Sequence, residues 1–181
     1  TATGFRKKYD GQTTTVAAAA KLKNGEHVDG NFTYTVKNLE TGEEYTSKEA
    51  PAFTNSGKWE VTATTDNENC KETSKTVTVE ITKRNVLLVS EDQEWVYDGT
   101  EHRHEKVYVH ESGDGFVEGE EPEFHSFASI TDAGSTENTF SYRFNKRSGA
   151  TTLSRVARFL GIASEDPDNI AANYNIEVQH G

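Results

Sequence analysis

Apolar and polar residues alternate with a period of two in several short stretches of this 181-residue chain. Successive side chains of a β-strand point to opposite faces, so this alternation predicts strands with one buried face. The clearest stretches are Phe32 to Val36, Trp59 to Ala63, Val77 to Ile81, Thr139 to Phe144 and Tyr174 to Val178. Many short strands separated by turn residues predict an all-β protein.

Two short motifs occur twice along the chain and indicate a duplicated module. Tyr9-Asp10-Gly11 recurs as Tyr97-Asp98-Gly99, and Phe53 to Gly57 has a counterpart in Ile130 to Gly134. Asp-Gly pairs tolerate the positive φ angles of tight turns, so both copies of the first motif predict a turn after a strand. Between the copies, residues 78–89 close one strand pattern and open the next almost without a linker.

We therefore predict two β-sandwich modules, residues 1–84 and 85–181. A module of this size is near the lower limit of what folds around its own core. Aromatic side chains supply large buried areas in such small cores. The expected core anchors are the pairs Tyr9 with Trp59 and Tyr97 with Phe140.

One stretch departs from the strand pattern and predicts a short helix near residues 151–161. Four apolar residues from Leu153 to Leu160 fall at positions i, i+3, i+4 and i+7, and Gly161 follows as a helix end. We expect this helix to be inserted before the last strand of the second module. It would cover a sheet edge there, with partner binding as the alternative role.

The charge balance excludes one class of partner. The chain carries 30 acidic residues against 19 Lys and Arg, a formal net charge of −11. Phosphate binding requires clustered cations, so we expect no nucleic-acid partner. We also expect no membrane contact by this fragment, because no run of about 18 apolar residues occurs.

No arrangement of residues in the sequence predicts catalysis. The sequence lacks the Gly-x-Ser-x-Gly nucleophile motif and a phosphate-binding glycine loop. It also lacks a motif that would pair its cysteine with a histidine as a catalytic nucleophile and base. We therefore predict that the chain is not an enzyme and has no catalytic residues and no cofactor.

Metal binding is also not expected. His102 and His104 would share one face of a strand, with His110 or His125 as a third ligand, but charged neighbours favour solvated side chains. Two acidic clusters provide hard oxygen ligands without the spacing of a calcium loop. They are Asp114, Glu118, Glu120 and Glu121, and Glu165, Asp166 and Asp168.

Four runs follow one another in the second half: Tyr97-Asp98-Gly99-Thr100, Gly113 to Phe116, Thr131 to Phe140 and Asn173 to Ile176. Taken in this order they resemble the Ig-like MBG-type repeats of bacterial, largely Gram-positive, surface proteins. The likeness covers nearly all of residues 85–181.

The first half resembles a sister repeat less closely. The runs that carry this likeness are Tyr9-Asp10-Gly11, Ala50 to Trp59 and Val77 to Arg84. For both halves the resemblance implies Ig-like sandwiches, and β-grasp-like modules are the alternative fold.

The resemblance also implies an extracellular, cell-wall-associated location in a secreted or wall-anchored surface protein. The expected function is a non-catalytic structural or spacer module whose partners are neighbouring modules of the same protein. The first alternative is an adhesin domain that binds a host glycan or protein through exposed aromatic residues. The candidates for this binding are Trp95, Tyr108 and Phe159. The second alternative is an accessory region of a secreted enzyme.

Overall fold

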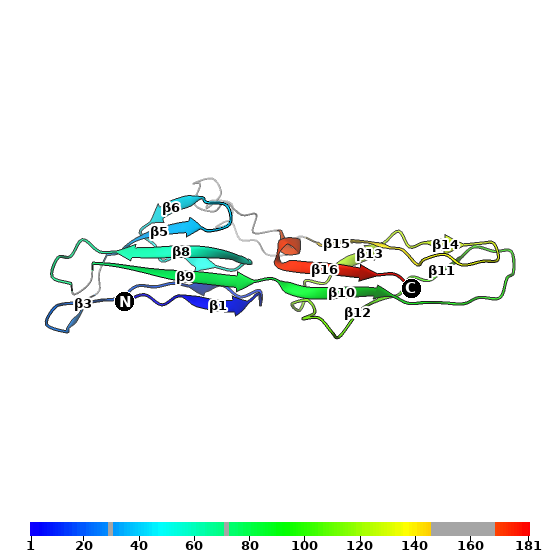
Figure 1. The fold of residues 1–181 in the computed structure, drawn as a ribbon, viewed down its shortest axis with the longest axis horizontal. Coiled ribbons are helices and arrows are strands. Elements are labelled where there is room, and N and C mark those ends of the chain that lie inside the picture. Colours follow the sequence, from blue (N-terminus) through cyan, green and yellow to red (C-terminus); the bar gives the residue numbers. More distant parts are fainter. Residues whose placement is uncertain (29–30, 71–72, 146–168) are drawn as a thin grey trace. The chain divides into compact units, whose positions relative to one another are not determined.

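The structure is a computed structural model that describes residues 1–28, 31–70, 73–145 and 169–181. Apart from one short 3-10 helix, every regular element among these residues is a β-strand (Figure 1). The all-β prediction is therefore confirmed for the described part of the chain. The predicted helix near residues 151–161 lies outside that part.

The chain divides into two compact units. Of the described residues, the first unit holds 1–83 and the second holds 84–145 and 169–181.

The first unit is built on a five-stranded sheet with the strand order β1-β9-β8-β5-β6. Its strands are β1 (Phe5–Lys8), β5 (Thr33–Asn38), β6 (Glu44–Ser47), β8 (Gly57–Thr64) and β9 (Ser74–Thr82). β1 runs parallel to β9, and the other neighbours are antiparallel. In Figure 1 the long strands β8 and β9 lie side by side along the sheet.

Two short ladders complete the first unit. β2 (Thr14–Thr15) pairs with β7 (Ala52–Phe53), and β3 (Ala20–Lys21) pairs with β4 (His27–Val28). The β2–β7 ladder packs on the sheet, because the ring of Phe53 lies 4.8 Å from the ring of Trp59 on β8.

The core of the first unit follows from the alternation along its strands. On β8, Trp59, Val61 and Ala63 are buried, and the residues between them are more exposed. Tyr9, which follows β1 directly, is fully buried and donates its backbone N–H to Thr82. The predicted core pair Tyr9 and Trp59 is therefore confirmed.

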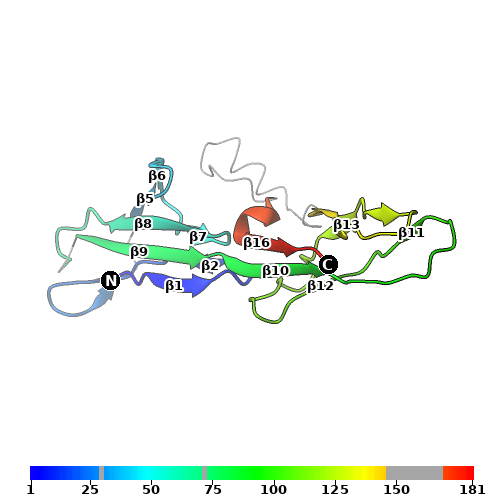
Figure 2. The same ribbon diagram turned by 45° about the vertical axis from the view of Figure 1, so that its right-hand side comes forward.

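The second unit contains a three-stranded sheet with the strand order β12-β10-β16. β10 (Arg84–Ser90) pairs with β12 (Val107–Val109) antiparallel and with β16 (Tyr174–Gln179) parallel (Figure 2). The 3-10 helix η1 (Ile170–Asn173) precedes β16. The first and last strands of this unit are thus paired in parallel, as β1 and β9 are in the first unit.

Two antiparallel ladders lie outside this sheet. β11 (His102–Arg103) pairs with β14 (Ser129–Ile130), and β13 (Glu123–His125) pairs with β15 (Ser141–Arg143).

The buried residues of the second unit centre on β10 and β16. Val86 and Leu88 on β10 are buried, as is Tyr174 at the start of β16, and all three are at most 5% exposed. The Tyr174 ring contacts the rings of Phe116 and Phe144.

The predicted core role of Tyr97 is wrong, because its side chain is 64% exposed. β10 ends at Ser90, so Tyr97 lies in the loop that follows, whereas Tyr9 directly follows β1. Phe140, its expected partner, is half-buried and packs with Phe124 and Phe127 instead.

Candidate functional site

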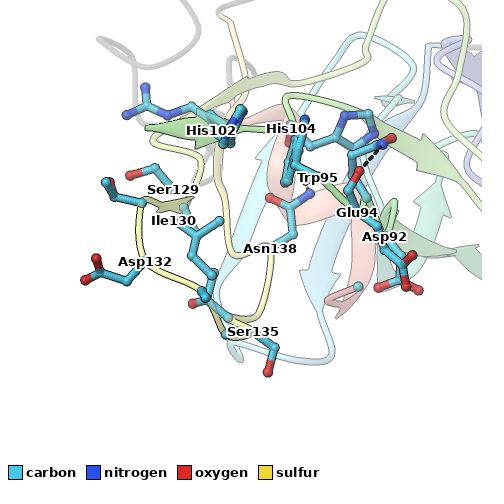
Figure 3. Close-up of a pocket in the computed structure, with 18 of the residues that line it drawn as sticks. Asp92, Glu94, Trp95, His102, His104, Ser129, Ile130, Asp132, Ser135 and Asn138 are labelled. Atoms are coloured by element: carbon cyan, nitrogen blue, oxygen red, sulfur yellow. Dashed lines mark hydrogen bonds between the residues drawn. The ribbon is translucent and has the colours of Figure 1, made fainter. Parts of the chain in front are cut away.

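A pocket of about 710 Å³ lies in the second unit. Its walls come mainly from residues 91–104 and 128–138, which face each other in Figure 3. β11 and β14 each contribute both of their residues to the lining. The volume falls within the range of roughly 300–1,000 Å³ that is typical of small-ligand sites.

An aromatic cluster forms one side of this pocket. The indole of Trp95 stacks on the imidazole of His102, with ring centroids 5.2 Å apart and an interplanar angle of 18°. The ring of His104 meets the same indole edge-on at 6.4 Å. His102 lies on β11 and His104 directly follows this two-residue strand, so their two-residue spacing in extended chain brings both to one ring. Trp95 is nevertheless 41% exposed, so part of the indole is open to a ligand.

Hydrogen bonds at the turn before β11 hold His102 in place. The carboxylate of Asp98 accepts bonds from the backbone N–H and the hydroxyl of Thr100, at 2.9 and 2.7 Å. The same oxygen lies 2.9 Å from Nε2 of His102. The hydroxyl of Thr100, then its N–H, then His102 lower the pKa of Asp98 to about 2.

We expect Thr100→Val to raise the pKa of Asp98 from about 2 towards 3.8, because the variant removes the strongest donor to the carboxylate. A depressed pKa stabilises the folded state above the unfolded pKa, and this contribution is lost as the pH falls towards 2. The measurement is the Cγ chemical shift of Asp98 between strongly acidic and neutral pH. The control is Thr131→Val, a change in the pocket lining that should leave the titration of Asp98 unchanged. An equal titration midpoint of Asp98 in Thr100→Val and the wild type would contradict the role of the Thr100 hydroxyl as a donor to Asp98.

Asn138 ties the two walls of the pocket together. Its side-chain amide donates to the backbone oxygens of Glu91 and His104, both at 3.0 Å. Its own backbone oxygen accepts a 2.7 Å bond from the hydroxyl of Ser90, and its N–H donates to the backbone oxygen of Gly181. The loop that carries Asn138 is therefore fixed to the end of β10 and to the segment that carries His104.

Glu91, which also lines the pocket, forms an ion pair with Lys106. Nζ of Lys106 lies 2.7 Å from its carboxylate and lowers the pKa of Glu91. Nε2 of His104 lies 3.5 Å from the other oxygen of Glu91, and it is a buried atom without a hydrogen bond.

The remaining charges of the lining are unevenly distributed. Arg103 is paired with Glu101 at 3.0 Å and with Glu105 at 3.8 Å. The carboxylates of Asp92, Glu94 and Asp132 also line the pocket, and within the described residues none of the three has a hydrogen bond or an ion pair. The pocket is therefore acidic, and its one guanidinium is already neutralised.

The histidines and acidic residues that were considered as metal ligands do not form a metal site in the described part of the chain. Within the described residues, no group of three or more His, Cys, Asp and Glu side chains converges as a metal site. Asp114 accepts from the backbone N–H of Asn85, and Glu120 accepts from the hydroxyl of Tyr174. The second acidic cluster, from Glu165 to Asp168, lies outside the described residues.

The three predicted binding residues have different outcomes. Trp95 lines the pocket. Tyr108 is 43% exposed on β12 and contacts the ring of His110, but it is not part of the pocket lining. Phe159 lies outside the described residues. The prediction missed Asn138, although this residue falls within the run from Thr131 to Phe140 that carries part of the resemblance.

Comparisons of the chain with protein-family models, with curated proteins and with solved structures find no match. Among the described residues, no helix has the length and apolar character needed to cross a membrane. The resemblance to MBG-type repeats therefore stays a prediction from short motifs.

Proposed function

We propose that this chain is a non-catalytic structural module of a secreted or wall-anchored bacterial surface protein, and that its two units resist tension along the chain. The observation that carries this proposal is the parallel pairing of the first and last strands in each unit. β1 and β9 pair from Phe5↔Val79 to Lys8↔Thr82. β10 and β16 pair from Arg84↔Tyr174 to Val89↔Gln179.

Parallel pairing determines how tension acts on each ladder. The chain enters β10 at Arg84 and leaves β16 at Gln179, which are opposite ends of the same ladder. Tension therefore pulls the two strands past each other and loads their hydrogen bonds together. In an antiparallel pair of terminal strands, both ends would lie at the same edge, and the bonds would break one after another.

The connection between the units supports the same function. β9 ends at Thr82 and β10 begins at Arg84, so Lys83 alone separates the two strands. A one-residue connection has no slack to extend before tension reaches the next ladder.

The finer fold belongs to this proposal as well: two tandem Ig-like sandwiches, residues 1–84 and 85–181, with a short helix inserted near 151–161. A β-grasp packs a helix on its sheet, and the described residues of 1–83 include no helix, which favours the Ig-like alternative for the first module. On the resemblance to MBG-type repeats, we place the chain outside the cell in association with the wall, with neighbouring modules as its partners.

The pocket at Trp95 favours a second candidate function, an adhesin domain that binds a host protein or glycan. No feature of the described residues favours the third candidate, an accessory region of a secreted enzyme.

Force spectroscopy along two directions tests the proposed function. Cys70, the buried free thiol, is first replaced by alanine. Handles are then attached at Lys83→Cys and Gln179→Cys, which shears the β10–β16 ladder, or at Lys83→Cys and Asn175→Cys, which peels the ladder from its Arg84–Tyr174 end. We expect a several-fold higher unfolding force in the shearing direction, because the six residue pairs of the ladder are loaded together.

Asn175→Cys also removes the hydrogen bond that Nδ2 of Asn175 donates to Oδ1 of Asn85, so the shearing variant carries Asn175→Ala. The direction of force is then the variable. Asn175 and Gln179 are both exposed positions on β16. Equal unfolding forces in the two directions would exclude the proposed mechanical function.

A further inference from the structure

The lining of the Trp95 pocket carries more negative than positive charge. It contains the carboxylates of Asp92, Glu94 and Asp132, the carboxylate of Glu91, which is paired with Lys106, and one guanidinium, that of Arg103. Because Arg103 is paired with Glu101 and Glu105, it does not neutralise the carboxylates of the pocket. An unpaired carboxylate in a partly enclosed site favours a ligand that is positively charged.

The aromatic wall of the pocket also favours a positively charged ligand. The face of an indole is the negative end of its quadrupole, and it attracts cations more strongly than the ring of Tyr or Phe does. Trp95 is held against His102 and His104, so a ligand meets an indole with a fixed orientation. A planar guanidinium can stack on this ring and also donate paired hydrogen bonds to a carboxylate, which an ammonium group cannot do.

The strands beside the pocket favour a peptide as the carrier of this group. Among the described residues, β11 pairs with β14 alone, and β14 pairs with β11 alone. Each strand therefore has one edge whose backbone groups are open to another strand. His102 and Arg103 on β11, and Ser129 and Ile130 on β14, all line the pocket. An extended peptide that adds to this ladder can place a side chain in the pocket next to it.

We propose that the Trp95 pocket binds an arginine side chain of an extended peptide segment from a partner protein, with the guanidinium stacked on Trp95 and paired with the free carboxylates. This binding function is independent of the proposed resistance to tension, which depends on the β10–β16 ladder. The net charge of −11 on the chain adds a long-range attraction for a basic segment.

The test uses two blocked pentapeptides, acetyl-Thr-Val-Arg-Val-Thr-amide and its twin in which citrulline replaces arginine. Citrulline has nearly the same shape as arginine without the charge. Binding is followed by the fluorescence of Trp95 in a Trp59→Phe background and by the NMR signals of the Trp95 indole. We expect the arginine peptide to bind at least roughly tenfold more tightly than the citrulline peptide.

Variants of the protein separate the pocket from the rest of the surface. Trp95→Ala removes the fluorescent reporter, so binding to this variant is followed by the amide NMR signals of His102, Ser129 and Ile130 in the pocket lining. This variant should abolish the preference for arginine. Asp132→Asn, an exposed change that leaves the aromatic cluster intact, should weaken binding of the arginine peptide roughly three- to tenfold. Tyr108→Ala, at an exposed aromatic residue outside the pocket, should leave binding unchanged.

Three results would overturn the proposal. The first is equal binding of the arginine and citrulline peptides, including no binding of either at millimolar concentration. The second is an affinity for the arginine peptide that is unchanged in both single variants, Asp132→Asn and Trp95→Ala. The third is tighter binding of a glucosamine tetramer than of the arginine peptide, which would assign the pocket to an amino sugar.

Discussion

Replacing Trp59 by alanine should lower the free energy of unfolding of the first unit by about 3–5 kcal/mol, because the variant removes the largest side chain of its core. Trp59 is 8% exposed on β8, the strand between β5 and β9. Its ring packs against Phe53 at 4.8 Å and therefore joins the sheet to the β2–β7 ladder. Gly57 lies so close to the indole that an added Cβ would approach Cη2 to 2.6 Å, so the site is shaped around this ring.

A loss of this size approaches the whole stability of a small domain, which is about 5–15 kcal/mol. We therefore expect the amide signals of residues 1–83 to lose their dispersion in the NMR spectrum of Trp59→Ala. Trp95 remains as the single tryptophan of this variant, and its fluorescence reports the second unit alone. If each unit folds around its own core, the urea midpoint measured at Trp95 stays at the wild-type value.

Leu39→Ala provides the control for Trp59→Ala, since Leu39 is 44% exposed in the same unit and its truncation should change stability by less than about 0.5 kcal/mol. A folded first unit in Trp59→Ala would contradict the assigned core. A shift in the Trp95 midpoint would instead contradict the independence of the two units.

The long strands of the first unit could be predicted from the sequence because one of their faces is buried. β8 alternates buried residues with more exposed ones over its whole length, and the sequence shows the same alternation from Trp59 to Ala63. The strands β2, β3 and β7 have two residues each, which is too short for a period to be visible. Their pairing depends on tertiary contacts such as that between Phe53 and Trp59.

The parallel ladders could not be predicted from local pattern. Phe5 and Val79 are neighbours in the sheet although most of the first unit lies between them in the sequence. The repeated Tyr-Asp-Gly motif was also misleading, because equal motifs do not occupy equal places: Tyr9 adjoins its strand and is buried, whereas Tyr97 follows a loop and is exposed.

The candidate site was predictable in part. An exposed tryptophan is a reasonable binding candidate from sequence alone, and Trp95 does line a pocket. The structure adds its surroundings: two histidines against the indole, and Asn138 holding together walls that are far apart in the sequence. Such a hydrogen-bonding role leaves no periodic signal, since one asparagine in a loop resembles any other.

Tyr174→Phe should destabilise the second unit by about 2–3 kcal/mol through the loss of one oxygen atom. The hydroxyl of Tyr174 donates a 2.6 Å bond to the carboxylate of Glu120 and accepts a 3.0 Å bond from the N–H of Val117. Glu120 is 7% exposed, so its carboxylate cannot replace the lost bond with bulk water at no cost. Phenylalanine keeps the ring contacts with Phe116 and Phe144, and the change therefore isolates the hydrogen bonds.

Urea unfolding followed at Trp95 in a Trp59→Phe background measures this loss. Tyr142→Phe is the matched control, because Tyr142 is 36% exposed in the same unit and the change should alter stability by less than about 0.5 kcal/mol.

Glu120→Gln tests the same hydrogen bond from its other end. It keeps an acceptor for the tyrosine hydroxyl without the charge, so it should destabilise the second unit less than Tyr174→Phe does. The double variant should lose less stability than the sum of the two single variants. Tyr174 opens β16 opposite Arg84, at one end of the ladder proposed to resist tension. Equal stabilities of Tyr174→Phe and Tyr142→Phe would mean that the ring of Tyr174, and not its hydroxyl, anchors that end of β16.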